Sequence, residues 1–117
     1  MPQLLWILND PPYGTERSYN GLRHATVMAK EAECTVRIFL MADAVACARR
    51  GQQTANGYYN LERMLQVLVR QGAQCGACGT CMDARGLGEA DVIAGVHRST
   101  LAELSTWTLE ADQVLVY

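Results

Sequence analysis

The sequence predicts an α/β fold in which a mainly parallel sheet is covered by helices on both faces. Short apolar runs, typical of buried strands, alternate along the chain with longer amphipathic stretches, typical of helices. Such alternation favours right-handed crossovers between parallel strands. The length of 117 residues is that of one domain, so residues 1–117 are expected to form a single unit.

The first half of the chain predicts two strand–helix units. Residues 3–8 are an apolar run that stops at a turn rich in proline and glycine, and they predict a strand. Thr15 can cap a helix that ends near Glu33, with an inner stripe of Leu22, Ala25, Met28 and Ala29. Residues 35–41 are β-branched and apolar and predict the second strand, and residues 43–50 a short helix.

The second half predicts three more strands. Residues 51–57 have glycine at both ends and predict an exposed loop, before a helix over residues 59–71 that Gly72 closes. A short strand over residues 73–78 would deliver three cysteines to a loop at its end. Residues 90–96 predict a further strand or part-strand, and residues 112–117 the last one.

A capping box predicts the last helix. Thr100 and Glu103 have its spacing, and Leu101, Leu104 and Thr108 follow as a helical stripe. With about five strands in total, the chain is expected to form a flavodoxin-like three-layer sandwich. Such a fold does not imply a bound flavin, and no glycine-rich phosphate loop is found, so we expect no cofactor.

Composition excludes some functions. The net charge of −2 lacks the basic excess of nucleic-acid-binding proteins. No stretch approaches the roughly 20 apolar residues of a spanning helix, so no membrane partner is expected. The N-terminus has neither a basic region nor a cleavage site, which indicates no signal peptide and favours a reducing cytoplasm. There, five cysteines indicate thiols or ligands rather than disulfides.

The chemistry is expected at Cys75, Cys78 and Cys81, which recur at intervals of three. A metal site would resemble a ferredoxin motif, but the short-spaced fourth cysteine and its proline are missing. On a strand, Cys75 and Cys78 also point to opposite faces. We therefore expect no metal.

Two interpretations of the thiols remain open. Cys78 and Cys81 form a C-x-x-C pair after a predicted strand, as in thiol–disulfide exchange proteins, but late in the chain and without a cis-proline candidate nearby. Alternatively, Cys78 is a nucleophile that carries sulfur. Gly79 lets backbone come close to it, a short helix over residues 80–84 would aim N–H groups at it, and Arg85 can add positive charge.

Three further residues are candidates for lining a pocket. Tyr13, Gly14 and Thr15 form the turn after the first predicted strand, at the sheet edge where the cysteine loop is expected. Arg85 is a candidate for binding substrate as well as for pairing with the thiolate. Cys34 and Cys47 are expected to be small packing residues, whereas Cys75 fits packing and function equally well.

The chain resembles the DsrE/DsrF-like family, in its YchN-like group. The resemblance spans nearly the whole sequence and is strongest in residues 11–25, 67–87 and 97–117. Its most specific features are Cys78 placed seven residues before Arg85 and followed there by glycine, the P-Y-G-T turn, and the closing A-D-x-V-L run. Family resemblance implies a flavodoxin-like fold, a homotrimer or homohexamer, and sulfur relay through a cysteine persulfide at the position of Cys78.

The resemblance therefore implies a sulfur carrier or sulfurtransferase-like protein whose partners are sulfur donor and acceptor proteins or small thiols. Cys75 and Cys81 depart from the pattern, because relay members do not need a second thiol at either place. Cys81 is expected to act as a resolving thiol that attacks a persulfide on Cys78. The alternatives are a non-catalytic, oligomeric module that binds a small ligand, and a C-x-x-C redox protein.

Overall fold

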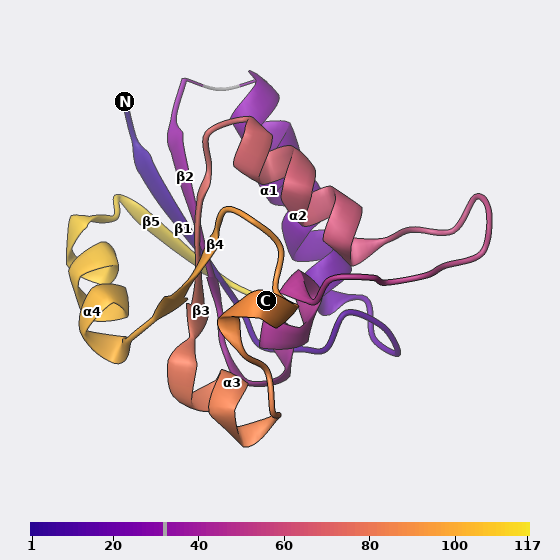
Figure 1. Cartoon of the computed structure of the whole chain (residues 1–117). Coiled ribbons are helices and arrows are strands. Elements are labelled where there is room, and N and C mark those ends of the chain that lie inside the picture. The colour runs from indigo at the N-terminus through magenta and orange to yellow at the C-terminus, as the bar shows by residue number, and fades with distance from the viewer. Residues whose placement is uncertain (32) are drawn as a thin grey trace.

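The computed structural model describes residues 1–31 and 33–117. Five strands, four α-helices and two 3₁₀ helices follow one another in these residues (Figure 1). In chain order they are β1 (Gln3–Leu8), α1 (Arg17–Glu31), β2 (Thr35–Leu40), η1 (Ala42–Ala48), α2 (Leu61–Arg70), β3 (Gln74–Cys78), α3 (Gly79–Ala84), η2 (Glu89–Asp91), β4 (Val96–Ser99), α4 (Leu101–Glu110) and β5 (Gln113–Val116).

All strand pairs are parallel, and the order across the sheet is β4-β3-β2-β1-β5. Helices α1 and α2 lie on one face of the sheet, and α4 lies on the other (Figure 1). The predicted three-layer α/β sandwich with a parallel five-stranded sheet is confirmed. Its strand order differs from that of flavodoxin itself.

The two faces of the sheet are buried by different partners, because successive side chains of a strand alternate between faces. Trp6 faces α1, where its ring meets His24 edge-on at a centroid distance of 5.4 Å. Phe39 faces α4, where its ring meets Trp107 at 6.3 Å. Strand β1 is buried on both sides, because the consecutive residues Leu4, Leu5 and Trp6 are all buried, as its continuous apolar sequence predicts.

The buried residues of α4 differ from the apolar stripe that the sequence predicted. Trp107 is the buried residue of α4, whereas Leu101 and Thr108 are exposed and Leu104 is partly buried. Arg37 lies over the Trp107 ring at 5.2 Å, so the aromatic ring, which the stripe omitted, packs on the sheet. The predicted cap is confirmed, since Thr100 accepts a hydrogen bond from the amide of Glu103 at 3.1 Å.

The strand predicted over residues 90–96 is wrong in position. The structure has the short 3₁₀ helix η2 at Glu89–Asp91 and begins β4 only at Val96. Gly95 precedes β4 with φ of 93°, a left-handed conformation that interrupts extended backbone. Val92 and Ile93 are nevertheless buried, and the amide of Ile93 donates to the carbonyl of Ala48. The apolar run is therefore a buried connection rather than a strand.

The other predicted elements lie within a few residues of the observed ones. Helix α1 begins at Arg17, whose amide donates to the Thr15 hydroxyl at 3.4 Å, and its described part ends at Glu31. The predicted end near Glu33 involves Ala32, which lies outside the described residues. None of the helices in residues 1–31 and 33–117 combines the length and apolarity needed to cross a membrane.

Candidate functional site

Cys78 ends β3 and is also the residue that caps the N-terminus of α3. Its Sγ accepts a hydrogen bond from the backbone amide of Cys81 at 3.4 Å. The Thr80 hydroxyl lies 3.3 Å from the same sulfur, within hydrogen-bonding distance. Only 4% of the residue is exposed. A strand end that turns directly into a helix therefore holds this thiol among hydrogen-bond donors.

The hydrogen bonds favour the thiolate form of Cys78. Burial alone would raise its pKa, because it disfavours the charged form. Hydrogen bonds from the side chains of Cys81 and Thr80, and from their backbone amides, outweigh burial and lower the pKa below the ordinary value. A thiolate is the nucleophilic form of cysteine, so this residue is poised to react.

The pKa of Cys81 shifts in the opposite direction from that of Cys78. Burial and the hydrogen bond to Cys78 raise the pKa of the Cys81 thiol, although a backbone amide partly opposes them. That amide belongs to Ala42, which donates to the Cys81 Sγ at 3.2 Å. Ala42 has φ of 53°, in the left-handed region that non-glycine residues rarely adopt. The two cysteines are thus inequivalent, since the pKa of Cys78 is lowered and that of Cys81 is raised.

A cavity of about 300 Å³ opens at Cys78, between the ends of β3 and β4. Its lining combines residues that follow β3 with residues at the end of β4 and the start of α4, namely Cys78, Gly79, Thr80, Arg98, Ser99, Thr100 and Leu101. Strand β3 is followed by α3, which packs against η1. Strand β4 is followed by α4, which lies on the opposite face of the sheet. Crevices at such a divergence are where open α/β sheets bind ligands.

Arg98 is the cation of this cavity. Its guanidinium forms two parallel hydrogen bonds to the carboxylate of Asp83, at 2.7 and 2.8 Å. The bonds to Arg98 lower the pKa of Asp83 below its ordinary value. A Cβ atom built on Gly79 would lie 2.9 Å from both Cζ and Nε of Arg98, so the guanidinium lies against the Gly79 backbone. Gly79 is thus needed for the close approach.

Arg85 pairs with other groups than the Cys78 sulfur. Its Nε and Nη2 pair with Asp43, at 2.9 and 2.7 Å, and its Nη1 donates to the carbonyl of Cys81 at 3.0 Å. It is therefore tied to the C-terminal end of α3, two helical turns beyond Cys78. Arg85 is not part of the cavity lining, and its predicted role in binding substrate stays a prediction.

Tyr13, Gly14 and Thr15 do not line the Cys78 cavity either. The Tyr13 hydroxyl donates to Gln52 at 2.6 Å and accepts from the amide of Leu61 at 3.1 Å, so it joins the turn after β1 to the start of α2. Thr15 donates to Asp10 at 2.9 Å. Gly14 has φ of 95°, which allows the tight turn. These contacts order the turn, and binding of substrate there stays a prediction.

Cys47 and Cys75 are buried packing residues. Burial raises the pKa of Cys47 and of Cys75 to about 12, which keeps both protonated and unreactive. Cys75 pairs in register with Ile38 on the face opposite to Cys78, as strand alternation predicts. Within residues 1–31 and 33–117, no group of three or more metal-binding side chains comes together.

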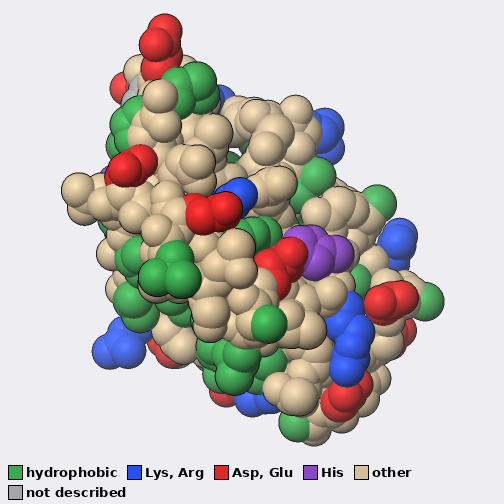
Figure 2. Space-filling view, turned by 90° about the vertical axis from the view of Figure 1, so that its left-hand side faces the viewer, with side chains coloured by type: hydrophobic (Ala, Val, Ile, Leu, Met, Phe, Trp, Pro, Cys, Tyr) green, Lys and Arg blue, Asp and Glu red, His purple; other side chains and the backbone are tan. Residues whose placement is uncertain are grey.

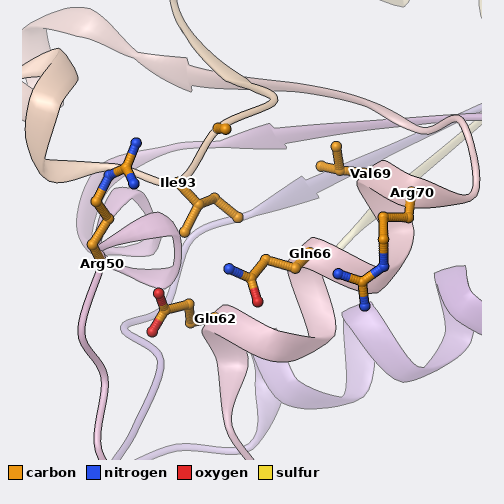
Figure 3. A pocket seen from close by; sticks show the side chains of 7 residues that line it. Arg50, Glu62, Gln66, Val69, Arg70 and Ile93 are labelled. Carbon is orange, nitrogen blue, oxygen red and sulfur yellow. The ribbon is translucent and has the colours of Figure 1, made fainter.

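A larger cavity, of about 350 Å³, lies between α2 and the loop before β4 (Figure 3). The side chains of Arg50, Glu62 and Gln66 border it, and Arg70 lies at its other end (Figure 3). The Glu62 carboxylate accepts hydrogen bonds from the amides of Gly51 and Gln52. No cysteine lines this cavity, so its size does not make it the site of thiol chemistry.

Comparison with known proteins identifies the family of the chain. The model of the DsrE/DsrF-like family matches residues 3–117. The chain belongs to the DsrE/DsrF-like family. Protein YchN of Escherichia coli strain K12 is 41% identical over the full length of both chains. An uncharacterised protein of Methanopyrus kandleri is 40% identical over 95% of this chain and 90% of its own.

Two solved structures show how well the family fold is retained. The crystal structure of YchN from Escherichia coli superposes with a TM-score of 0.92, at 40% identity, over all of both chains. A protein of unknown function from Methanobacterium thermoautotrophicum superposes with a TM-score of 0.77 over all of both chains. Because its identity is only 16%, this second likeness concerns the fold alone.

In this DsrE/DsrF-like protein, sequence reasoning missed Arg98, Asp83 and Ala42. Arg98 was missed because β4 was predicted several residues too early, which left Arg98 outside any strand end. The signal was available, since residues 96–99 precede the capping box at Thr100 and so had to end near the sheet edge. The left-handed conformation of Ala42 has no sequence signal, because alanine rarely adopts it.

Proposed function

We propose that this protein is a sulfur carrier, with sulfurtransferase-like chemistry, that holds sulfane sulfur as a persulfide on Cys78. The observation that carries the proposal is the asymmetric thiol pair at the edge of an open cavity. Cys78 is favoured as thiolate and Cys81 as thiol. Membership of the DsrE/DsrF-like family supports the same conclusion.

Loading is a nucleophilic displacement. The Cys78 thiolate attacks the sulfane sulfur of a donor, and a new S–S bond forms between that sulfur and Sγ. The bond between the sulfane sulfur and the rest of the donor breaks, and the leaving group departs with the electron pair. A thiolate of an acceptor protein or small thiol then removes the outer sulfur by the same displacement, which regenerates the Cys78 thiolate.

Cys81 offers a second way to release the sulfur. Its thiolate attacks the inner sulfur of the persulfide, the S–S bond of the persulfide breaks, and hydrosulfide leaves with the bonding electrons. A disulfide between Cys78 and Cys81 remains, and a cellular dithiol must reduce it before the next cycle. Free thiols at all five cysteines fit a reducing compartment such as the cytoplasm, where we place this activity.

Intact mass spectrometry after incubation with inorganic polysulfide tests the proposal. The wild-type protein should gain about 32 Da for each sulfur atom bound, and a reductant should remove the gain. Cys78→Ser should abolish it, and Cys34→Ser, the matched control, should not. Cys81→Ser should leave a longer-lived persulfide and slower sulfide release. Loading that persists in Cys78→Ser would refute the assignment.

A thiol–disulfide exchange protein is the second candidate, because the backbone amide of Cys81 donates to the Cys78 Sγ and so keeps the two cysteines of the C-x-x-C pair close. That function requires a Cys78–Cys81 disulfide that forms and is reduced reversibly without any sulfane donor. Redox titration, with the disulfide detected by peptide mapping, separates it from sulfur carriage. A protein that shows neither a persulfide nor a reversible disulfide would instead match the non-catalytic binding module.

A further inference from the structure

The entrance to the Cys78 cavity has an electrostatic character that sulfur carriage alone does not require. The cavity wall holds one guanidinium, that of Arg98, which lies against Gly79, the residue after Cys78. The pKa of Arg98 is raised, chiefly by its bonds to Asp83, with a smaller contribution from the charge of Cys78. Positive charge and nucleophile therefore share one small space.

The position of the Arg98 guanidinium is fixed from two sides. Asp83, on α3, holds Nη1 and Nη2 through its two carboxylate oxygens. The absence of a side chain at Gly79 lets the group lie against the backbone next to Cys78. A guanidinium has five N–H donors, and within the described residues the hydrogen bonds of Arg98 to Asp83 use two of them. Its remaining donors can bind a ligand.

We infer that the Cys78 cavity takes anionic sulfane donors, small molecules that carry an oxyanion group, and that Arg98 binds this group. The inference rests on the proposed function of Cys78 as the sulfur-bearing thiol. Arginine suits the task because its planar fork matches the oxygens of carboxylates and related oxyanions. The volume of about 300 Å³ admits a small molecule of this kind.

The chemistry explains why a cation is needed there. When thiosulfate is the donor, a thiolate must approach a dianion, and the two repel each other. The Cys78 thiolate attacks the outer sulfur, the new Sγ–S bond forms, and the S–S bond of thiosulfate breaks. Sulfite leaves with the electron pair, so a thiolate and thiosulfate become a persulfide anion and sulfite. Arg98 offsets the repulsion during approach and holds the sulfonate oxygens that depart as sulfite.

The first experiment measures charge selectivity without any sulfur transfer. Iodoacetate and iodoacetamide alkylate the same thiolate by the same reaction, but only iodoacetate is an anion. The rate constant for iodoacetate divided by that for iodoacetamide at Cys78 is therefore independent of the pKa of the thiol. Peptide mapping of the full-length protein measures both rate constants. We expect the ratio to fall about fivefold in the double variant Arg98→Gln, Asp83→Asn, which removes one charge of each sign.

Matched variants isolate the guanidinium. Asp83→Asn alone keeps the cation and should leave the ratio unchanged or higher. Gly79→Ala keeps every charge but displaces the guanidinium, because a Cβ atom there would lie 2.9 Å from it, and should lower the ratio. Arg70→Gln, on α2 and away from the cavity, should not change it. A ratio that stays at the wild-type value in the double variant overturns the inference.

The second experiment joins selectivity to sulfur loading. The thiosulfate concentration that half-saturates persulfide formation on Cys78 should rise about fivefold in the double variant. An unchanged half-saturating concentration overturns the inference even when the alkylation ratio responds. A protein that gains no sulfur from polysulfide or thiosulfate, yet keeps an Arg98-dependent alkylation ratio, refutes the proposed function and leaves the anion selectivity standing.

Discussion

At the scale of single residues, the candidate site is defined by hydrogen bonds to one sulfur atom, that of Cys78. Sequence spacing pointed to Cys78 as a candidate, because a cysteine at the end of a buried strand and next to glycine lies where α/β sheets place their sites. It could not show that the Thr80 hydroxyl and the Cys81 amide contact that sulfur. Those contacts depend on the local path of the chain, which residue types alone do not determine.

Replacement of Thr80 by valine tests the role of its hydroxyl. The two side chains have nearly the same shape, so Thr80→Val removes a hydrogen bond that lowers the pKa of Cys78. The rate of iodoacetamide alkylation at Cys78, measured against pH, should have its midpoint below that of an ordinary thiol, about 8.5. In Thr80→Val the midpoint should move upward. Thr26→Val, a distant control on α1, should leave the midpoint in place.

Ala42 offers a test of backbone strain at the same site. A left-handed conformation costs a residue with a Cβ roughly 1–2 kcal/mol, and glycine avoids this cost. We therefore expect Ala42→Gly to raise the free energy of unfolding by about 0.5 kcal/mol in urea titrations, after the entropy that glycine loses on folding. Ala44→Gly, in the same 3₁₀ helix but buried, should lower it by about 1 kcal/mol. Destabilisation by both substitutions would show that φ at Ala42 carries no strain.

At the scale of elements, prediction succeeded where a local signal was strong and failed where tertiary contacts decided. Helix α2 has a polar cap at Asn60 and an apolar stripe, and it was placed within two residues at its start. The apolar residues Val92 and Ile93 suggested a strand, but they are buried in a connection that bonds to Ala48. Burial alone does not distinguish a strand from a buried loop in a run this short.

Helix α4 forms one wall of the cavity, and Glu103 fixes its start to β4. The carboxylate accepts a hydrogen bond from Ser99 at 2.5 Å and contacts the His97 ring. Burial acts to raise the pKa of Glu103, but these two partners outweigh it and hold the pKa below the ordinary value. The contact of His97 with an acid was not expected from the sequence, because Glu103 is six residues away and on another element.

The shift in Glu103 predicts how stability depends on pH. A carboxyl group whose pKa is lower in the folded state stabilises the fold in full above its ordinary pKa, about 4.3, because there it is ionised. The contribution is lost as the pH falls through the lower folded-state pKa. Urea titrations of Glu103→Gln should therefore show a smaller loss of stability on acidification than wild type. An identical pH profile for Glu103→Gln would contradict the role of this carboxylate.

At the scale of the whole molecule, the two sides of the sheet are covered unequally. Helices α1 and α2 pack together on one side, and α4 lies on the other (Figure 1). Figure 2 views the α4 side and shows hydrophobic side chains at the surface among charged ones. Leu109 is 88% exposed and Val116, on the edge strand β5, is 66% exposed. Val116 shares the α4 face of the sheet, because it pairs in register with Ile7.

We expect this uneven surface to be buried between copies of the chain in a closed homotrimer or homohexamer. Exposed apolar side chains gathered on one side, beside an open strand edge, are typical of surfaces that associate. Light scattering at micromolar concentration should give a mass of three or six times the 12.9 kDa chain. Leu109→Glu and Val116→Glu should each shift the protein towards monomer, because a carboxylate is costly to bury without a partner. Val27→Glu, an exposed control on α1, should leave the assembly intact. A monomeric wild-type protein would exclude the assembly, and a monomer produced equally by Val27→Glu would place the contact elsewhere.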